Sequence, residues 1–147
     1  MNVSIIVPMY NEQNNAENTL NKIDAVTSSL GKSYELIAVN DGSKDDTLEI
    51  LNKIASKNKK ITICNHTVNR GFGNALKTGF KNSKGDIIIP IDADLSYSAK
   101  CIPALIHEIE SNPNIDIVTL SPYMKGGKTP GVPFFRLLIS KIGNRIV

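Results

Sequence analysis

The sequence has few cysteines, no long apolar run and no block of charge of one sign. Cys64 and Cys101 lie in different predicted elements without metal-type spacing, so we expect both to be small buried hydrophobic residues. No apolar run approaches the roughly 20 residues of a membrane-spanning helix, and the first lysine is Lys22, so neither a spanning helix nor a secretory signal is expected. We therefore expect a cytoplasmic protein.

Charge is present but scattered. The 17 Lys and Arg residues outnumber the 14 Asp and Glu residues by only three, and the basic residues are spread along the chain. A nucleic-acid-binding protein usually gathers its basic residues on one face or in one segment. The sequence therefore predicts no nucleic-acid partner.

Short apolar runs alternate with segments of helical periodicity along the 147 residues, a length that suits one domain with its own core. The expected strands cover residues 3–8, 36–39, 61–64, 86–91 and 115–120. The segments with helical spacing are 16–30, 48–55, 75–80 and 102–109. This alternation predicts an α/β protein with a doubly wound, mostly parallel sheet and helices on both faces.

Two local features refine this prediction. The run 86–91 is nearly all isoleucine, which is typical of a strand covered on both faces. Ser43, with Asp46 three residues later, predicts an N-cap for the second helix.

The end of the chain has a different character. Residues 121–133 contain three Gly, three Pro and two Lys, which predicts a mobile loop, and residues 134–147 return to amphipathic helical spacing. We therefore expect a core over 1–120 and a separate segment over 121–147 that continues in a longer protein.

Polar residues follow each of the first four predicted strands. They lie at 8–12, 40–43, 69–73 and 92–94. In an open parallel sheet the ligand binds beyond the carboxyl ends of the strands, so these four segments are expected to meet at one edge.

Asp92 and Asp94 are the strongest candidates for chemistry. They stand two residues apart at the end of a predicted strand, and a period of two would project both carboxylates to the same side. Carboxylate pairs of this kind suit Mg²⁺ or Mn²⁺ and leave coordination positions for water and substrate phosphates. The pair therefore predicts a metal site that binds a nucleoside di- or triphosphate.

Each of these residues also has a purely structural interpretation. Asp92 and Asp94 suit an ordinary acidic loop, and Asp41 suits a turn residue before a helix, because Asp-Gly is a frequent turn pair. Tyr10 and Glu12 suit a surface tyrosine and a solvated acid. The combination of the segments carries more weight than any one of them.

Taken in order, these segments resemble the motifs of family 2 glycosyltransferases of the GT-A fold. The matching stretches are 4–12 (SIIVPMYNE), 39–43 (VNDGS) with Asp45 and Asp46, 69–80 (NRGFGNALKTGF) and 92–95 (DADL). The resemblance covers nearly the whole chain and is strongest to the dolichol- or polyprenyl-phosphate sugar synthases. It implies a Rossmann-like nucleotide-diphospho-sugar transferase.

The resemblance implies a role for each matching residue. The first two motifs hold the nucleoside of a UDP- or GDP-sugar, and the segment before the third helix, with Gly71 and Gly73, lies near its phosphates; the implied nucleotide-binding residues are Pro8, Tyr10, Glu12, Asp41 and Lys77. Asp92 and Asp94 match the catalytic metal-binding signature, with Mg²⁺ or Mn²⁺ as cofactor.

Three positions depart from the pattern of this branch. Pro122 stands where an arginine that faces phosphate is frequent, Ser96 stands where Gln is common, and Asn40 replaces a frequent Asp. Lys125, Lys128 and Arg136 remain to bind an acceptor phosphate. The implied acceptor is a lipid phosphate, reached by peripheral contact with the cytosolic face of a membrane in the cell envelope, where the apolar face of 134–147 would lie.

Other functions stay open at this point. The acceptor could instead be a glycan hydroxyl, and the chain could be a truncated, non-catalytic nucleotide-sugar-binding domain. A phosphatase of the haloacid dehalogenase type is more distant, because its pattern fits 92–96 but requires later strands with a lysine and further acids.

Overall fold

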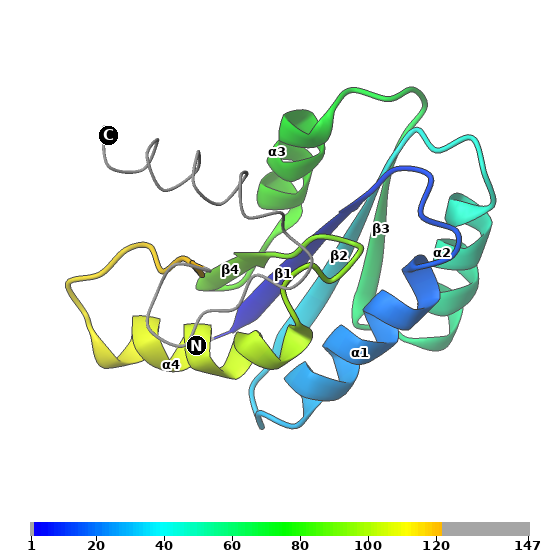
Figure 1. The fold of residues 1–147 in the computed structure, drawn as a ribbon. Helices are drawn as coiled ribbons and strands as arrows, with labels where there is room; N and C mark the ends of the chain where they lie inside the picture. The colour runs from blue at the N-terminus through cyan, green and yellow to red at the C-terminus, as the bar shows by residue number, and fades with distance from the viewer. Residues whose placement is uncertain (1, 122–147) are drawn as a thin grey trace, which may run out of the picture. The chain divides into compact units, whose positions relative to one another are not determined.

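The computed structural model describes residues 2–121, and the segments at their core form one parallel four-stranded sheet (Figure 1). The strands are β1 (Val3–Met9), β2 (Tyr34–Asp41), β3 (Ile61–His66) and β4 (Ile87–Pro90). Their order is β3-β2-β1-β4. The four predicted strands up to residue 91 are confirmed.

Helices cover both faces of the sheet, as predicted. They are α1 (Ala16–Ser28), α2 (Thr47–Lys57), α3 (Phe72–Asn82) and α4 (Ile102–Ser111), the last preceded by the short 3₁₀ turn Ala99–Cys101. Figure 1 shows α3 on one face and α1, α2 and α4 on the other. Met1–Ile115 form one compact unit, to which all these elements belong.

The alternation of side chains along β1 explains why the sheet has two covered faces. Val3, Ile5 and Val7 pack with the side of α1, α2 and α4, whereas Ile6 packs with Ala75 of α3. All seven residues of β1 are buried, which is the pattern of a central parallel strand. Burying these side chains on both faces stabilises the sheet at the strand that carries the first motif.

Helix α3 approaches the sheet closely at Gly79. A Cβ atom on this residue would lie 2.3 Å from the Cγ2 atom of Ile6. Only glycine permits this contact. The close approach helps to set the distance between α3 and β1, and thereby the place where α3 begins above the ends of the strands.

Strand β4 corrects one prediction. Its isoleucine run suggested a strand covered on both faces, but β4 lies at the edge of the described sheet, pairs with β1, and exposes 37% of Ile88. Pro90 is also exposed. Proline has no N–H to donate to a further strand, which suits an edge position.

The strand predicted at 115–120 does not form. Residues 117–121 have no regular structure, and Ile117 is 78% exposed. A β-strand needs a neighbour for its backbone hydrogen bonds, and none of residues 2–121 pairs with this segment. The apolar run that predicted the strand therefore has no pairing partner within the described part of the chain.

Two smaller predictions are also resolved. Ser43 does not cap α2, because its hydroxyl accepts from the Asn11 N–H, and the first N–H of α2 instead donates to Asp45 Oδ1 at 3.1 Å. Both cysteines are free and only partly buried, so the expectation of buried hydrophobic residues is confirmed only in part. Within the described part of the chain, no helix is both long and apolar enough to cross a membrane.

Candidate active site

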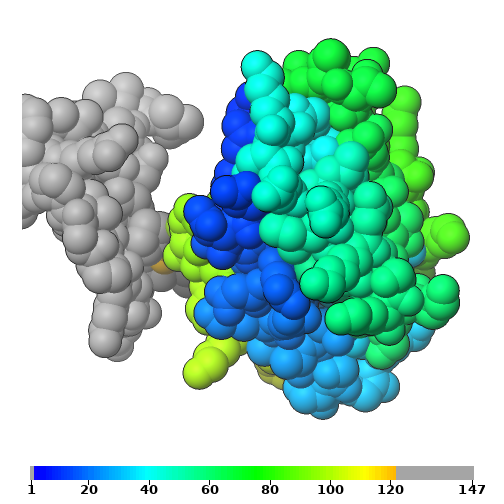
Figure 2. Space-filling view, turned by 90° about the vertical axis from the view of Figure 1, so that its right-hand side faces the viewer, coloured from blue at the N-terminus to red at the C-terminus, as the bar shows by residue number. Residues whose placement is uncertain are grey.

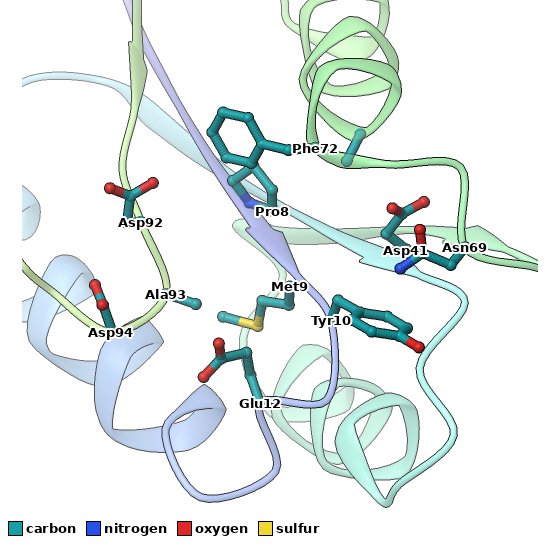
Figure 3. Close-up of a pocket in the computed structure, with 11 residues that line it drawn as sticks. Pro8, Met9, Tyr10, Glu12, Asp41, Asn69, Phe72, Asp92, Ala93 and Asp94 are labelled. Carbon is teal, nitrogen blue, oxygen red and sulfur yellow. The ribbon is translucent and has the colours of Figure 1, made fainter.

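A pocket of about 380 Å³ opens at the carboxyl ends of the strands (Figure 3). A volume of this size falls in the range of small-molecule sites. Its lining comes from all four strand ends and the start of α3, and comprises Pro8, Met9, Tyr10, Glu12, Asp41, Asn69, Phe72, Ala75, Asp92, Ala93 and Asp94. The predicted convergence at one edge of the sheet is therefore confirmed.

The pocket has two sides, which Figure 3 shows apart from each other. The β2 side consists of Tyr10, Asp41 and Asn69, and the β4 side of Asp92, Ala93 and Asp94.

On the β2 side, Asp41 is buried and has three hydrogen-bond partners from the protein. The residue is 3% exposed. Oδ1 lies 2.6 Å from His66 Nδ1 and accepts from the Arg70 N–H at 3.0 Å, and Oδ2 accepts from the Gly71 N–H at 2.8 Å. Burial raises the pKa of the Asp41 carboxyl, but these hydrogen bonds together outweigh burial and leave the pKa below its ordinary value.

These contacts give the glycine-containing segment a different role from the expected one. The Arg70 and Gly71 N–H groups, which lie just before α3, donate to Asp41. Gly71 has a φ of 86°, which favours glycine, whereas a Cβ atom on Gly73 would meet open space. The protein's own carboxylate therefore occupies two donors that the sequence suggested for a phosphate.

The first two motifs are joined through their loops. The N–H groups of Asn11, Glu12 and Gln13 donate to Ser43 Oγ, Thr47 Oγ1 and Asp45 Oδ2, respectively. In the opposite direction, Asn11 Oδ1 accepts from the Lys44 N–H at 2.9 Å. Figure 2, which looks onto the side of α2 and β3, shows the blue start of the chain packed against the cyan residues that follow β2.

Asn40, at the position where the family branch often has Asp, is buried and forms a hydrogen bond within the protein. It is 1% exposed, and its Nδ2 donates to Asn65 Oδ1 on β3 at 2.7 Å. The amide therefore joins the ends of β2 and β3 at the residue that precedes Asp41.

On the β4 side, a turn brings Asp92 and Asp94 to the pocket. β4 ends at Pro90, and the Leu95 N–H donates to the Asp92 carbonyl at 3.1 Å. The strand period of two was therefore the wrong reason for placing both carboxylates together. Thr19 of α1, which is 1% exposed, fixes the turn by donating its hydroxyl to the Ala93 carbonyl at 2.6 Å.

The β4 side has the carboxylate oxygen ligands that a hard divalent cation prefers. Both aspartates are exposed, and Ser96 donates its N–H and its hydroxyl to Asp94. These hydrogen bonds hold the pKa of the Asp94 carboxyl below its ordinary value, so it is ionised at neutral pH. Two exposed carboxylates fit Mg²⁺ or Mn²⁺ that keeps further positions for water or phosphate. Among residues 2–121, no group of three or more His, Cys, Asp or Glu side chains is arranged to enclose a metal.

The structure brings together six of the residues proposed from the sequence. The six residues that share the pocket are Pro8, Tyr10, Glu12, Asp41, Asp92 and Asp94. Lys77 is exposed on α3 and does not line the pocket. Lys125, Lys128 and Arg136 lie outside the described residues.

Sequence reasoning missed the buried residues that form hydrogen bonds to the pocket-lining residues. Thr19 and His66 are buried polar side chains that contact Ala93 and Asp41, respectively. Phe72 was part of a recognised motif without a role, yet it lines the pocket and is 60% exposed. A polar residue on an otherwise apolar helical face, as at Thr19, was the one available signal.

The parallel sheet and the aspartate pair after β4 define an α/β protein of the GT-A class. A sequence model of glycosyl transferase family 2 matches residues 4–143, and the chain belongs to this family. The resemblance found in the motifs is therefore confirmed, and the phosphatase alternative is set aside.

Two curated relatives and one solved structure illustrate the match. A dolichol-phosphate mannosyltransferase of Pyrococcus furiosus is 39% identical over 96% of this chain and 39% of its own length. An undecaprenyl-phosphate 4-deoxy-4-formamido-L-arabinose transferase of Klebsiella pneumoniae is 31% identical over 99% of this chain and 42% of its own. The chain thus spans about two fifths of these relatives.

The solved structure is a mannosyltransferase from Pyrobaculum calidifontis in complex with GDP-Man and Mn²⁺. It superposes with a TM-score of 0.66 and 28% identity over 77% of this chain and 33% of that one. This likeness confirms the predicted GT-A fold.

Proposed function

We propose that the protein moves a sugar from a UDP- or GDP-sugar to a polyprenyl or dolichyl phosphate, with Mg²⁺ or Mn²⁺ as cofactor. One observation carries this proposal: a single pocket has a buried carboxylate held by the protein, Asp41, on one side and two exposed carboxylates, Asp92 and Asp94, on the other. A nucleotide sugar has a nucleoside at one end and a diphosphate next to its sugar. The two sides suit these two parts.

The β2 side would bind the nucleoside. Tyr10 is 41% exposed and offers an aromatic ring, and Asp41 has acceptor capacity left on Oδ2, which has one N–H donor. Pro8 and Glu12 complete the lining between the two sides. These residues would orient the donor so that its diphosphate reaches the β4 side.

The β4 side would bind the diphosphate through the cation. Asp92 and Asp94 would supply carboxylate ligands, and Thr19 and Ser96 would keep the turn and the Asp94 carboxylate in place. When bound, the cation neutralises the charge that develops on the departing nucleoside diphosphate. The Mn²⁺ in the Pyrobaculum calidifontis structure supports this assignment.

A phosphate acceptor suits the groups that the pocket offers. Transfer to a hydroxyl requires a general base within hydrogen-bond reach. The pocket carboxylates, Glu12, Asp41, Asp92 and Asp94, all have a role at the donor, and Glu108 and Glu110 on α4 bond to Asn112 and Lys32 instead. A phosphate monoester, with a second pKa near about 6, arrives already anionic.

The relatives support the same acceptor, since their names include dolichol phosphate and undecaprenyl phosphate. Such an acceptor would place the enzyme in the cytoplasm, peripherally on the cytosolic membrane face. Lys125, Lys128 and Arg136 remain the proposed acceptor-phosphate residues.

The test offers full-length enzyme radiolabelled UDP- and GDP-sugars with either polyprenyl phosphate or oligosaccharides, in Mn²⁺, Mg²⁺ or EDTA. We expect metal-dependent label in an organic-extractable lipid that mild acid releases. Label only in glycan, with a bell-shaped pH profile, would overturn the acceptor. Nucleotide-sugar binding without turnover by the full-length enzyme would favour the non-catalytic binding domain.

A further inference from the structure

We propose that His66 and Thr78 are positioning residues for the nucleoside, which they hold in place through Asp41. This inference rests on the proposed function, because it assigns the β2 side to the nucleoside. Neither residue lines the pocket. They act behind it, in a hydrogen-bonded chain that joins the end of β3, the end of β2 and the middle of α3.

The chain begins at Thr78 on α3. Its Oγ1 lies 2.9 Å from His66 Nε2, and His66 Nδ1 lies 2.6 Å from Asp41 Oδ1. An ionised carboxylate only accepts hydrogen bonds, so His66 Nδ1–H is the donor to Asp41. In the neutral ring Nε2 then accepts from the Thr78 hydroxyl, and every polar atom in the chain has a partner.

The chain fixes the direction of the Asp41 carboxylate. His66 and the Arg70 N–H both donate to Oδ1, whereas Oδ2 accepts from the Gly71 N–H. A carboxylate oxygen accepts about two hydrogen bonds, so Oδ2 keeps one position for a ligand donor. His66 thereby helps to fix the carboxylate of a pocket-lining residue in an orientation that leaves Oδ2 with the free position.

Burial makes this arrangement hard to replace. His66 is 8% exposed and Asp41 3%, so water cannot readily substitute for a missing partner. Gly42, next to Asp41, has a φ of 68°, and a Cβ atom on it would lie 2.3 Å from the Val68 carbonyl carbon. The backbone after β3 therefore packs tightly against the end of β2, and His66 ties the same two segments through side chains.

A nucleoside whose base has a ring N–H suits the free position on Asp41 Oδ2. Uracil and guanine both carry a ring N–H, whereas the ring nitrogens of cytosine and adenine that face a pairing partner are acceptors. If His66 no longer directs the carboxylate, this donor contact weakens while the β4 side keeps its own supports. The expected result is a loss of nucleotide affinity that spares turnover.

The first experiment measures hydrogen exchange of the Arg70 and Gly71 amides by NMR, which requires no ligand. His66→Phe removes both hydrogen bonds, His66→Asn keeps a donor near the Nδ1 position, and Thr78→Val removes only the hydroxyl. We expect exchange to accelerate about tenfold in His66→Phe and less in the other two. Thr78→Ser should return toward wild-type rates, and Thr62→Val, an exposed β3 substitution, should match wild type.

The second experiment measures binding of UDP and GDP with Mn²⁺ by calorimetry, and KM and kcat of the full-length enzyme for the nucleotide sugar. We expect Kd and KM to rise about fivefold in Thr78→Val and more in His66→Phe, with kcat within about twofold. A merely structural role would lower the active fraction at unchanged Kd. Thr78→Val keeps the test decisive if His66→Phe does not fold.

The outcomes separate this inference from the proposed function. If wild type binds neither UDP nor GDP, the proposed function fails, while amide exchange still tests the hydrogen-bonded chain. If wild type binds but both amides exchange at wild-type rates in His66→Phe, and Kd is unchanged, the inference is overturned.

Discussion

The two sides of the pocket differ in how many hydrogen-bond partners the protein supplies to their carboxylates and in how exposed those carboxylates are. On the β2 side, Asp41 is 3% exposed and takes hydrogen bonds from a side chain and two backbone N–H groups. On the β4 side, Asp92 and Asp94 are both exposed, and the hydrogen bonds that Asp94 accepts within the described residues come from Ser96, two residues away.

This difference shows that one pocket can be rigid on one side and open on the other. A buried charge is stable only if the protein supplies partners for it, so the Asp41 carboxylate is already held in place before a ligand arrives. Exposed carboxylates instead exchange water for a cation at little structural cost. Substitutions should therefore affect binding alone on the β4 side, but binding and stability together on the β2 side.

The largest effect is expected for Asp94→Ala. Removing one of two proposed metal ligands should lower Mn²⁺-dependent nucleotide-sugar binding by about 100-fold or more. The melting temperature should stay close to wild type, because the side chain is exposed and its contacts are local. Calorimetry measures the first and a thermal melt the second, with Glu49→Gln on α2 as the exposed-acid control. Unchanged affinity would remove the metal assignment.

Asp41→Asn should affect both properties. The amide keeps one acceptor but places an NH₂ group against N–H donors, so we expect a loss of about 2–3 kcal/mol in the free energy of unfolding. Affinity for the free nucleoside diphosphate should fall about tenfold. Urea unfolding and calorimetry measure these effects. A changed sugar preference at wild-type nucleotide affinity would contradict the assignment of Asp41 to the nucleoside.

Thr19→Val tests whether the β4 side depends on the hydrogen bond from α1 to the Ala93 carbonyl. It replaces the buried hydroxyl by a methyl group of similar size and leaves the Ala93 carbonyl without its 2.6 Å partner. We expect metal-dependent binding to weaken about fivefold. Thr19→Ser keeps the hydroxyl and should bind nearly as wild type. Equal affinity in both variants would mean that the turn holds its shape without α1.

The smallest expected effect is on the free energy of unfolding at acidic pH. The pKa of Asp41 lies below its ordinary value of 3.8, so the folded state holds this carboxylate ionised after the unfolded chain begins to take up the proton. Its contribution to stability is therefore full above the ordinary pKa and declines as the pH falls through that value toward the folded pKa. Urea unfolding from pH 6 to pH 3 should show the difference between wild type and Asp41→Asn shrinking over about the last pH unit. A constant difference would contradict the lowered pKa.

Much of the fold could be predicted because local periodicity and burial agree in these elements. The helical spacing at Ala16, Leu20 and Ile23 matches the face that α1 buries. The pattern failed where the structure depends on neighbours. Among residues 2–121, the apolar run 115–120 has no pairing strand, and β4 is as apolar as a central strand but lies at the edge of the described sheet.

The site divides in the same way. Asp41, Asp92 and Asp94 could be predicted because strand ends in a parallel sheet meet at one edge. Thr19 and His66 could not, since their contacts with Ala93 and Asp41 span 74 and 25 residues of sequence, respectively. No local pattern encodes such distances. Lys77 shows the converse, because a motif position does not by itself bring a side chain into a pocket.

The edge position of β4 has a consequence for local unfolding. This strand has four residues, and among residues 2–121 it is held by β1 alone, whereas β1 itself is paired on both sides. Short edge strands open at a lower free energy than central ones, so the strand that leads to Asp92 and Asp94 should be the first to exchange its amides. A ligand that spans the pocket would tie this strand to the centre of the sheet. Its binding energy would then also be folding energy for β4.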